Sequence, residues 1–387
     1  MFDLTTLTLL AGLFFAAIAG EAVLYSDTLY LRVNVPDSLQ KKGFSELFAE
    51  ETFTSEAARI VGGHSIIPAP DMRVHSRPTM ATAIAQPLRL EHVVRLLQEN
   101  FGIKTLSVTA AIIEREAKPD DKPAAGKTPS LEMALIIFDA EQENGPEQVR
   151  ITQENGDPVA LVQHGAQWSM ERIVPYRVTL AHFLAGVQGD ASGFVAARET
   201  AMRALDRTLG QDDGSKRAML YNVLANIAII ENNLPGAVQA YALADQIPGV
   251  VPQVRAEMGL NRALVAVALK QPGQAAAILQ QAKLASPHLD LPGFDTNLRL
   301  IEGLVAWANG DLTTAEKIFR GVVADEPLNE AGHYYLGKIL AVRGDNDGSA
   351  GELSFALATR STEPPTQGLV IRLFWIDPVS GTTTKRF

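Results

Sequence analysis

Hydrophobic and small residues recur at helical spacing through the second half of the chain, and residues 302–327, EGLVAWANGDLTTAEKIFRGVVADEP, carry the clearest instance. The spacing predicts two helices joined by a short turn, because apolar side chains fall on one face of each half. Small residues would let the two helices approach closely, an aromatic side chain would fill the space between neighbouring pairs, and a proline would end the second helix. The positions that carry this pattern are Gly303, Ala306, Gly310, Ala315, Phe319 and Pro327.

The pattern recurs along residues 216–360, so that one predicted helix pair follows another. The aligned small residues of the first helices are Ala225, Ala263, Gly303 and Gly337. The last two are 34 residues apart, and the earlier steps are a few residues longer. The second helices follow in step at Ala237, Tyr241 and Ala244, at Ala275, Leu279 and Ala282, and at Ala315, Phe319 and Val322. We therefore expect about four stacked pairs, and we interpret the helical pattern at residues 176–205 as a degenerate first pair.

A repeated helix pair with this period and these small positions resembles the tetratricopeptide (TPR) repeat. The resemblance implies an all-α superhelix whose first helices line a concave groove that binds segments of other proteins. In that groove Asn222 and Asn226 would hydrogen-bond the backbone of an extended peptide, and the leucines would form an apolar floor. The alternative is that the leucines and Trp307 pack against a neighbouring helix. The expected groove positions are Asn222, Asn226, Leu260, Leu264, Leu300, Leu304, Trp307, Tyr334, Tyr335 and Lys338.

The first residues of the chain form a separate apolar run. Residues 4–25 contain one ionisable side chain, Glu21, over about the 20 residues that a helix needs to cross a bilayer. They predict a transmembrane helix; a cleaved signal peptide is the alternative, although the positive charges that usually precede one are absent. Gly12, Ala16 and Gly20 lie four apart on one face, a spacing that lets two membrane helices pack closely, so that both a homo-oligomer and a monomeric anchor stay open.

Two signals disagree about the side of the membrane that holds the rest of the chain. Arg32, Lys41 and Lys42 follow the apolar run and no lysine or arginine precedes it, so the positive-inside rule places the bulk in the cytoplasm. The family resemblance described below favours the opposite side. We expect a single-pass protein of a bacterial inner membrane, with its soluble part extracytoplasmic.

Residues 26–156 mix strand and helix patterns and predict a small α+β domain. Alternating apolar and polar residues indicate strands at residues 28–36, 79–85, 105–113, 131–139 and 148–152. Helices are predicted at residues 45–61, 90–101 and 157–173. The last three strands would form an antiparallel meander with one covered face.

The order of short motifs in and around this region resembles bacterial membrane-anchored TPR proteins with an N-terminal α+β domain. The matching residues are Val33, Val35, Pro36, Leu39, Gly43, Phe101, Gly102, Pro175, Tyr176 and Arg177. The resemblance covers most of the chain and implies an architecture, with no enzymatic activity attached to it. We therefore expect a multidomain chain with a transmembrane anchor (4–25), an α+β domain (26–156), linking helices with the degenerate repeat (157–215), TPR-like repeats (216–360) and a C-terminal tail with a β-strand (361–387).

Composition and charge exclude several functional classes. The 387 residues are 47% hydrophobic and 20% charged, which suits packed cores in two folded parts. A net charge of -10 without a basic stripe argues against nucleic acid as a partner. The chain has no cysteine, and its seven histidines lack metal-ligand spacing, so we predict no metal, no cofactor and no catalytic residue. The GKT at residues 126–128 lacks the first glycine of a phosphate-binding loop and is interpreted as a linker.

The C-terminal tail breaks the helical pattern. Residues 368–381 form a β-branched and aromatic run with no second strand beside it in the sequence. A single apolar strand must pair with something. It would join the α+β sheet, fill the groove of its own array, or add to a neighbouring subunit, and the last two arrangements would make it an autoinhibitor or an assembly device.

Taken together, the patterns favour a non-enzymatic, membrane-anchored TPR scaffold whose repeats bind partner proteins or build a homo-oligomer. The alternative is a ligand-sensing or auxiliary subunit of a membrane enzyme or transporter. In that case the α+β domain would bind a small ligand between the meander and the helix at residues 90–101.

Overall fold

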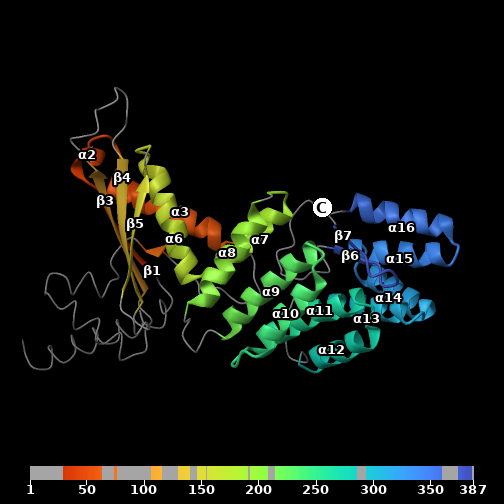
Figure 1. Ribbon diagram of the computed structural model, residues 1–387. Helices are drawn as coiled ribbons and strands as arrows, with labels where there is room; N and C mark the ends of the chain where they lie inside the picture. The colour runs from red at the N-terminus through yellow and green to blue at the C-terminus, as the bar shows by residue number, and fades with distance from the viewer. Residues whose placement is uncertain are drawn as a thin grey trace, which may run out of the picture. The chain divides into compact units, whose positions relative to one another are not determined.

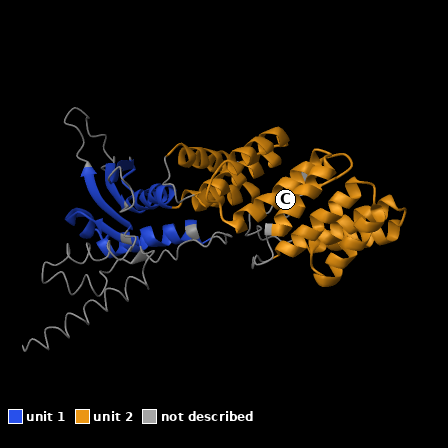
Figure 2. Ribbon diagram, turned by 90° about the horizontal axis from the view of Figure 1, so that it is seen from below, with its two compact units in different colours: residues 1–62, 68–173 blue, residues 63–67, 174–387 orange. Residues whose placement is uncertain are grey.

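The computed structural model describes residues 29–62, 74–75, 106–115, 130–139, 146–153, 155–190, 192–207, 214–285, 293–359 and 374–385. The chain divides into two compact units, residues 1–62 with 68–173 and residues 63–67 with 174–387 (Figure 2). The first unit is a sheet with helices against it, and the second is an array of helix pairs (Figure 1). The helix Pro158–Ile173, which follows the last strand of the sheet, therefore belongs to the first unit. The domain boundaries expected from the sequence stay predictions.

The first unit is built on a mixed sheet. Its elements are β1 Leu29–Asn34, α2 Asp37–Gln40, α3 Glu46–Val61, β2 Val74–His75, β3 Leu106–Arg115, β4 Ser130–Asp139, β5 Glu147–Gln153 and α6 Pro158–Ile173. Among the described residues the strand order is β2-β1-β3-β4-β5. Strands β3, β4 and β5 form the predicted antiparallel meander, in which Leu135 lies opposite both Ala110 and Val149. Strand β1 was expected, but its parallel pairing with β3, which sets Val33 opposite Ala110, was not.

Two helices cover one face of this sheet. Helix α3 packs against β1, α6 packs against β4 and β5, and the two helices pack on each other. In β4 the side chain of Met133 is fully buried under this layer, whereas Ile136 on the opposite face is 39% exposed. Gly165 lets α6 approach the sheet closely, because a Cβ at this position would lie 2.6 Å from Met133 Sδ. The prediction of a small sheet with a helix-covered face is therefore confirmed for the described residues.

Other sequence predictions for this part of the chain have mixed outcomes. The helix expected at residues 45–61 is α3, and Ser45 caps it by accepting a hydrogen bond from the Phe48 N–H at 3.2 Å. The strand at residues 79–85, the helix at residues 90–101 and the transmembrane helix at residues 4–25 lie outside the described residues. Within the described part of the chain, none of the helices combines the length and the hydropathy that a bilayer crossing demands.

The second unit is an array of antiparallel helix pairs. Its helices are α7 Pro175–Val187, α8 Gly193–Asp206, α9 Gly214–Ile230, α10 Leu234–Asp245, α11 Pro252–Ala268, α12 Pro272–Ala285, α13 Phe294–Ala308, α14 Leu312–Asp325, α15 Glu330–Val342 and α16 Asn346–Ala358. Each odd-numbered helix pairs with the next one, and each second helix also packs against the first helix of the following pair. The predicted TPR-like array is confirmed, and the stretch interpreted as a degenerate repeat forms the pair of α7 and α8.

The pairs close at the small residues that the sequence marks. A Cβ on Gly303 would lie 2.6 Å from the Phe319 ring, and a Cβ on Gly337 would lie 2.8 Å from Leu353 Cγ. Ala263 takes the equivalent place in α11 and is fully buried. The turn that follows each first helix contains a residue with a left-handed φ, and these residues are Gly189, Asn232, Lys270, Gly310 and Gly344. The turns are therefore alike even where the pair has no glycine to adopt this conformation freely.

The C-terminal tail forms a hairpin, so the expectation of a strand without a partner nearby in the sequence is wrong. Strand β6 (Phe374–Ile376) pairs antiparallel with β7 (Thr383–Lys385), and the two form a separate sheet among the described residues. Asp377 holds the connecting turn, because its Oδ1 accepts hydrogen bonds from the N–H groups of Val379 and Ser380. Sequence reasoning missed β7 because it is three polar residues long and shows no alternation.

Substituting Gly303 tests the close approach within a pair. Gly303→Ala is expected to lower the free energy of unfolding by about 1–3 kcal/mol, because the added methyl group overlaps the Phe319 ring in a packed core. Gly273→Ala is the control, since a Cβ there meets nothing within 4 Å, and it should stay within about 0.5 kcal/mol of the wild-type chain. Chemical unfolding followed by circular dichroism measures both. Equal stability of the two variants would contradict the packing described here.

Candidate functional site

The first helices of the pairs form a row, in which α9 packs on α7 and α11, and α11 packs on α13. The groove positions expected from the sequence lie on α9, α11, α13 and α15. Tyr334 and Lys338 are half-buried. The other expected positions are buried, namely Asn222, Asn226, Leu260, Leu264, Leu300, Leu304, Trp307 and Tyr335. The leucines and Trp307 thus pack inside the array, as the alternative interpretation held, and contact of any of these residues with a partner stays a prediction.

The two asparagines of α9 belong to a buried polar cluster. Asn222 Nδ2 donates to Glu257 Oε1 at 3.4 Å, and Asn261 Nδ2 donates to Asn222 Oδ1 at 3.0 Å. The Tyr241 hydroxyl donates to Asn226 Oδ1 at 3.4 Å. All five side chains are buried and come from α9, α10 and α11. The two asparagines therefore form hydrogen bonds with side chains of the neighbouring helices. The sequence had predicted hydrogen bonds from them to the backbone of a bound peptide.

Glu257 is the group in this cluster that sequence reasoning missed. Burial raises the pKa of Glu257 to about 8, and the hydrogen bond from Asn222 lowers it to a smaller extent. Its Oε2 atom is buried and has no hydrogen-bond partner among the described residues. The only local sign was its place in the apolar run AEMGL, because acids in helices of this kind usually face solvent.

Aromatic side chains connect the last pairs to the C-terminal hairpin. The rings of Phe319 and Tyr335 stack with centroids 5.5 Å apart, and Tyr335 meets Tyr334 edge-on at 5.3 Å. Tyr334 in turn stacks on Trp375 of β6 at 3.7 Å. The half-buried aromatic of the expected groove is therefore covered by a side chain of the same protein. Figure 1 shows β6 and β7 beside α15.

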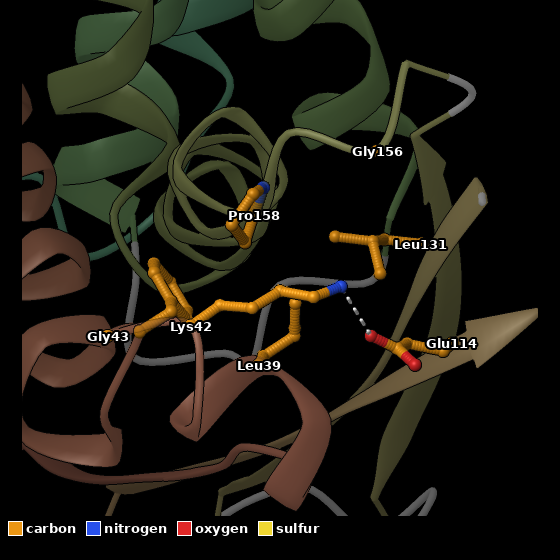
Figure 3. A pocket seen from close by; sticks show the side chains of 8 residues that line it. Leu39, Lys42, Gly43, Glu114, Leu131, Gly156 and Pro158 are labelled. Carbon is orange, nitrogen blue, oxygen red and sulfur yellow. Dashed lines mark ion pairs between the residues drawn. The ribbon is translucent and has the colours of Figure 1, made fainter. Parts of the chain in front are cut away.

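The first unit contains a pocket of about 380 Å³ at the end of its sheet (Figure 3). Its lining is mainly apolar, from Leu39, Phe44, Leu131 and Pro158 among others. The side chain of Lys42 extends along the pocket toward Glu114, with Nζ 3.8 Å from Oε1. The helix expected at residues 90–101, beside which a ligand was predicted to bind, lies outside the described residues, so this pocket is a different candidate.

Titratable clusters elsewhere have structural partners. Within the described residues, no group of three or more histidine and acidic side chains is arranged to hold a metal. His333 is the nearest approach to a catalytic pair, with Nδ1 2.5 Å from Glu352 Oε2 and Nε2 2.9 Å from the Pro327 carbonyl oxygen. Its ring also packs on Phe355 at 4.2 Å. These contacts tie α15 to α16 and to the end of the preceding pair.

Removing the charge of Glu257 tests the buried cluster. Because the folded-state pKa is raised from 4.5 to about 8, the unfolded chain releases a proton that the folded chain keeps, and stability falls as pH rises between these values. Glu257→Gln stays neutral, so it should match the wild-type chain near pH 5 and exceed it above pH 8, by roughly 2–5 kcal/mol. Urea unfolding at several pH values measures the difference. Glu199→Gln, on an exposed carboxylate of α8, is the control and should show no such divergence; a parallel profile for Glu257→Gln would contradict the cluster's electrostatics.

Comparison with known proteins bears on the array. A family model described as a tetratricopeptide repeat matches residues 302–364, which include α14, α15 and α16 with part of α13. No curated protein matches the chain. The matched residues contain the Gly303, Phe319 and Gly337 contacts that close the pairs. The family match and the stacked helix pairs together support a TPR protein.

Proposed function

We propose that this protein is a non-enzymatic scaffold whose TPR-type array binds segments of partner proteins. The observation that carries the proposal is the stacking of helix pairs from α9 to α16, to which the family match at residues 302–364 adds. Stacked pairs present a long surface whose shape is held by packing, which suits recognition of other proteins. The polar cluster around Glu257 and the His333 contacts are occupied in joining helices, and they leave the recognition role to the surface of the array.

We further propose that residues 4–25 anchor the array as a single-pass helix in a bacterial inner membrane, with the soluble part extracytoplasmic. The apolar run supports the anchor, and the family resemblance supports the extracytoplasmic side against the positive charges that follow the run. Gly12, Ala16 and Gly20 would form the seam through which two anchors associate into a homo-oligomer. Protease added to spheroplasts tests the orientation, because digestion of the array supports the proposal and protection of it contradicts it.

The second candidate function is binding of a small ligand in the first unit. Its support is the pocket between Leu39 and Leu131, whose volume lies in the range of small-molecule sites. Glu114 Oε1 is buried there without a hydrogen bond from the described residues, and the Lys42 ammonium at 3.8 Å is its nearest ion-pair partner. A ligand with one donor group and an apolar body would complement this lining.

A cross-linker placed on α15 tests the scaffold. A photoreactive residue in place of Lys338, half-buried on the row of first helices, should trap a defined partner in native membranes. The same residue in place of Lys317, exposed on the second helix α14, is the matched control and should trap the partner at least tenfold less. Gel analysis and mass spectrometry read the products. Equal labelling from both positions, or a monomer without any specific product, would count against the proposal.

Blocking the pocket tests the second function. Lys42→Trp should fill the mouth of the pocket, since the Lys42 side chain lines it and is 65% exposed. Lys41→Trp is the control, because Lys41 is exposed and does not line the pocket. Native mass spectrometry of the purified chains should find a bound small molecule in the control that falls at least fivefold in Lys42→Trp. An unbound wild-type chain would remove the support for this candidate.

A further inference from the structure

The C-terminal hairpin is held on the array by contacts of the kind that protein grooves make with peptides. Trp375 lies flat on Tyr334, with ring centroids 3.7 Å apart and an interplanar angle of 15°. Ile376 beside it is only 3% exposed, and its N–H donates to Tyr335 Oη at 3.2 Å. An aromatic face, an apolar hole and a main-chain hydrogen bond are the means by which grooves recognise extended segments.

The turn of the hairpin meets a different helix pair. Gly381 lies against the end of α11, where a Cβ would come within 2.4 Å of the Ala268 carbonyl oxygen. Pro378 in the same turn is buried. Burial of the Tyr334 phenol raises its pKa, and the negative charge of nearby Asp377 raises it further. The hairpin thus contacts both α15 and α11. These are first helices of two different pairs, and the pair of α13 and α14 lies between them in the sequence.

The hairpin depends on these contacts for its stability. Two paired strands of three residues each are too short to be stable alone in water. The turn is otherwise open to solvent, since Val379 is 62% exposed. Trp375 Nε1 is buried without a hydrogen-bond partner among the described residues. A segment that offered an acceptor at this point would avoid the cost of that unpaired donor.

We propose that the hairpin is an intramolecular ligand of the array, which occupies the site formed by Tyr334, Tyr335 and the end of α11. A partner segment of the same chemistry competes for this site. Such a segment is extended and carries an aromatic residue followed by a branched aliphatic one, as Trp375 and Ile376 do. The inference rests on the scaffold function and adds its regulation, because a tethered competitor at an effective concentration on the order of mM weakens binding of any partner in trans.

A labelled peptide of residues 374–385, FWIDPVSGTTTK, tests the proposal against the full chain by fluorescence anisotropy. Trp375→Ala removes the stack and Gly381→Ala pushes the turn from Ala268, so each should raise peptide affinity at least tenfold over the wild-type chain. Val379→Ala alters an exposed position of the same turn and should bind the peptide as the wild-type chain does. Adding Tyr334→Ala to Trp375→Ala should abolish the gain, because the site itself is then lost.

Equal peptide affinity in all chains, or no binding to the released variants, overturns the proposal. Hydrogen exchange tests the wild-type chain itself and so does not depend on the folding of a variant. If the hairpin leaves its site while the array stays folded, the Ile376 amide should exchange at least tenfold faster than the Leu304 amide in α13. Exchange of both only by global unfolding would make the hairpin a permanent part of the core and would also overturn it. If the released variants bind the peptide but the cross-linker at position 338 traps no partner protein, the scaffold function alone is contradicted. If the cross-linker traps a partner and Gly381→Ala does not increase the yield, the regulatory role of the hairpin alone is contradicted.

Discussion

Paired helices of the array lie so close that a methyl group does not fit between them at Gly303 or Gly337. At the first of these contacts the Phe319 ring takes the available space, and Tyr335 of the next pair stacks on it. The spacing within one pair therefore positions the following pair. Tyr335 contacts Tyr334, on which Trp375 stacks, so the docking of the tail depends on Gly303 in α13.

Packing outweighs surface charge in holding this array. Ion pairs such as Arg343 with Glu316 join neighbouring pairs at 2.6 Å, but the arginine is 42% exposed and pairs of this kind contribute about 0–1 kcal/mol each. Overlap in a packed core costs about 1–3 kcal/mol, a sizeable share of a total stability of about 5–15 kcal/mol. The Glu257 cluster adds a different constraint, because the hydrogen bonds of Asn222 with Glu257 and with Asn261 form only when α9 and α11 keep their register.

The candidate site illustrates how far sequence reasoning reached. Placing Asn222 on the row of first helices was correct, because helical spacing is a local property. Its partner could not be found in the same way, since Glu257 lies 35 residues later and a periodic pattern does not show which polar groups will meet. For Leu304 and Trp307 the pattern allowed either a groove floor or a core, and their burial depends on what neighbouring elements cover. Contact of the tail with its own array was one of the three arrangements that the sequence left open, but the pairing of β6 with β7 was not expected.

Local spacing of small, aromatic and apolar residues was sufficient to specify the helix pairs, their phase and the meander, because each depends on neighbours within a few tens of residues. Contacts between distant segments settled the remainder. The parallel pairing of β1 with β3 and the stacking of Trp375 on Tyr334 are of this kind. Each requires a surface that exists only once the helices or strands have packed, and so no stretch of the chain carries its pattern alone.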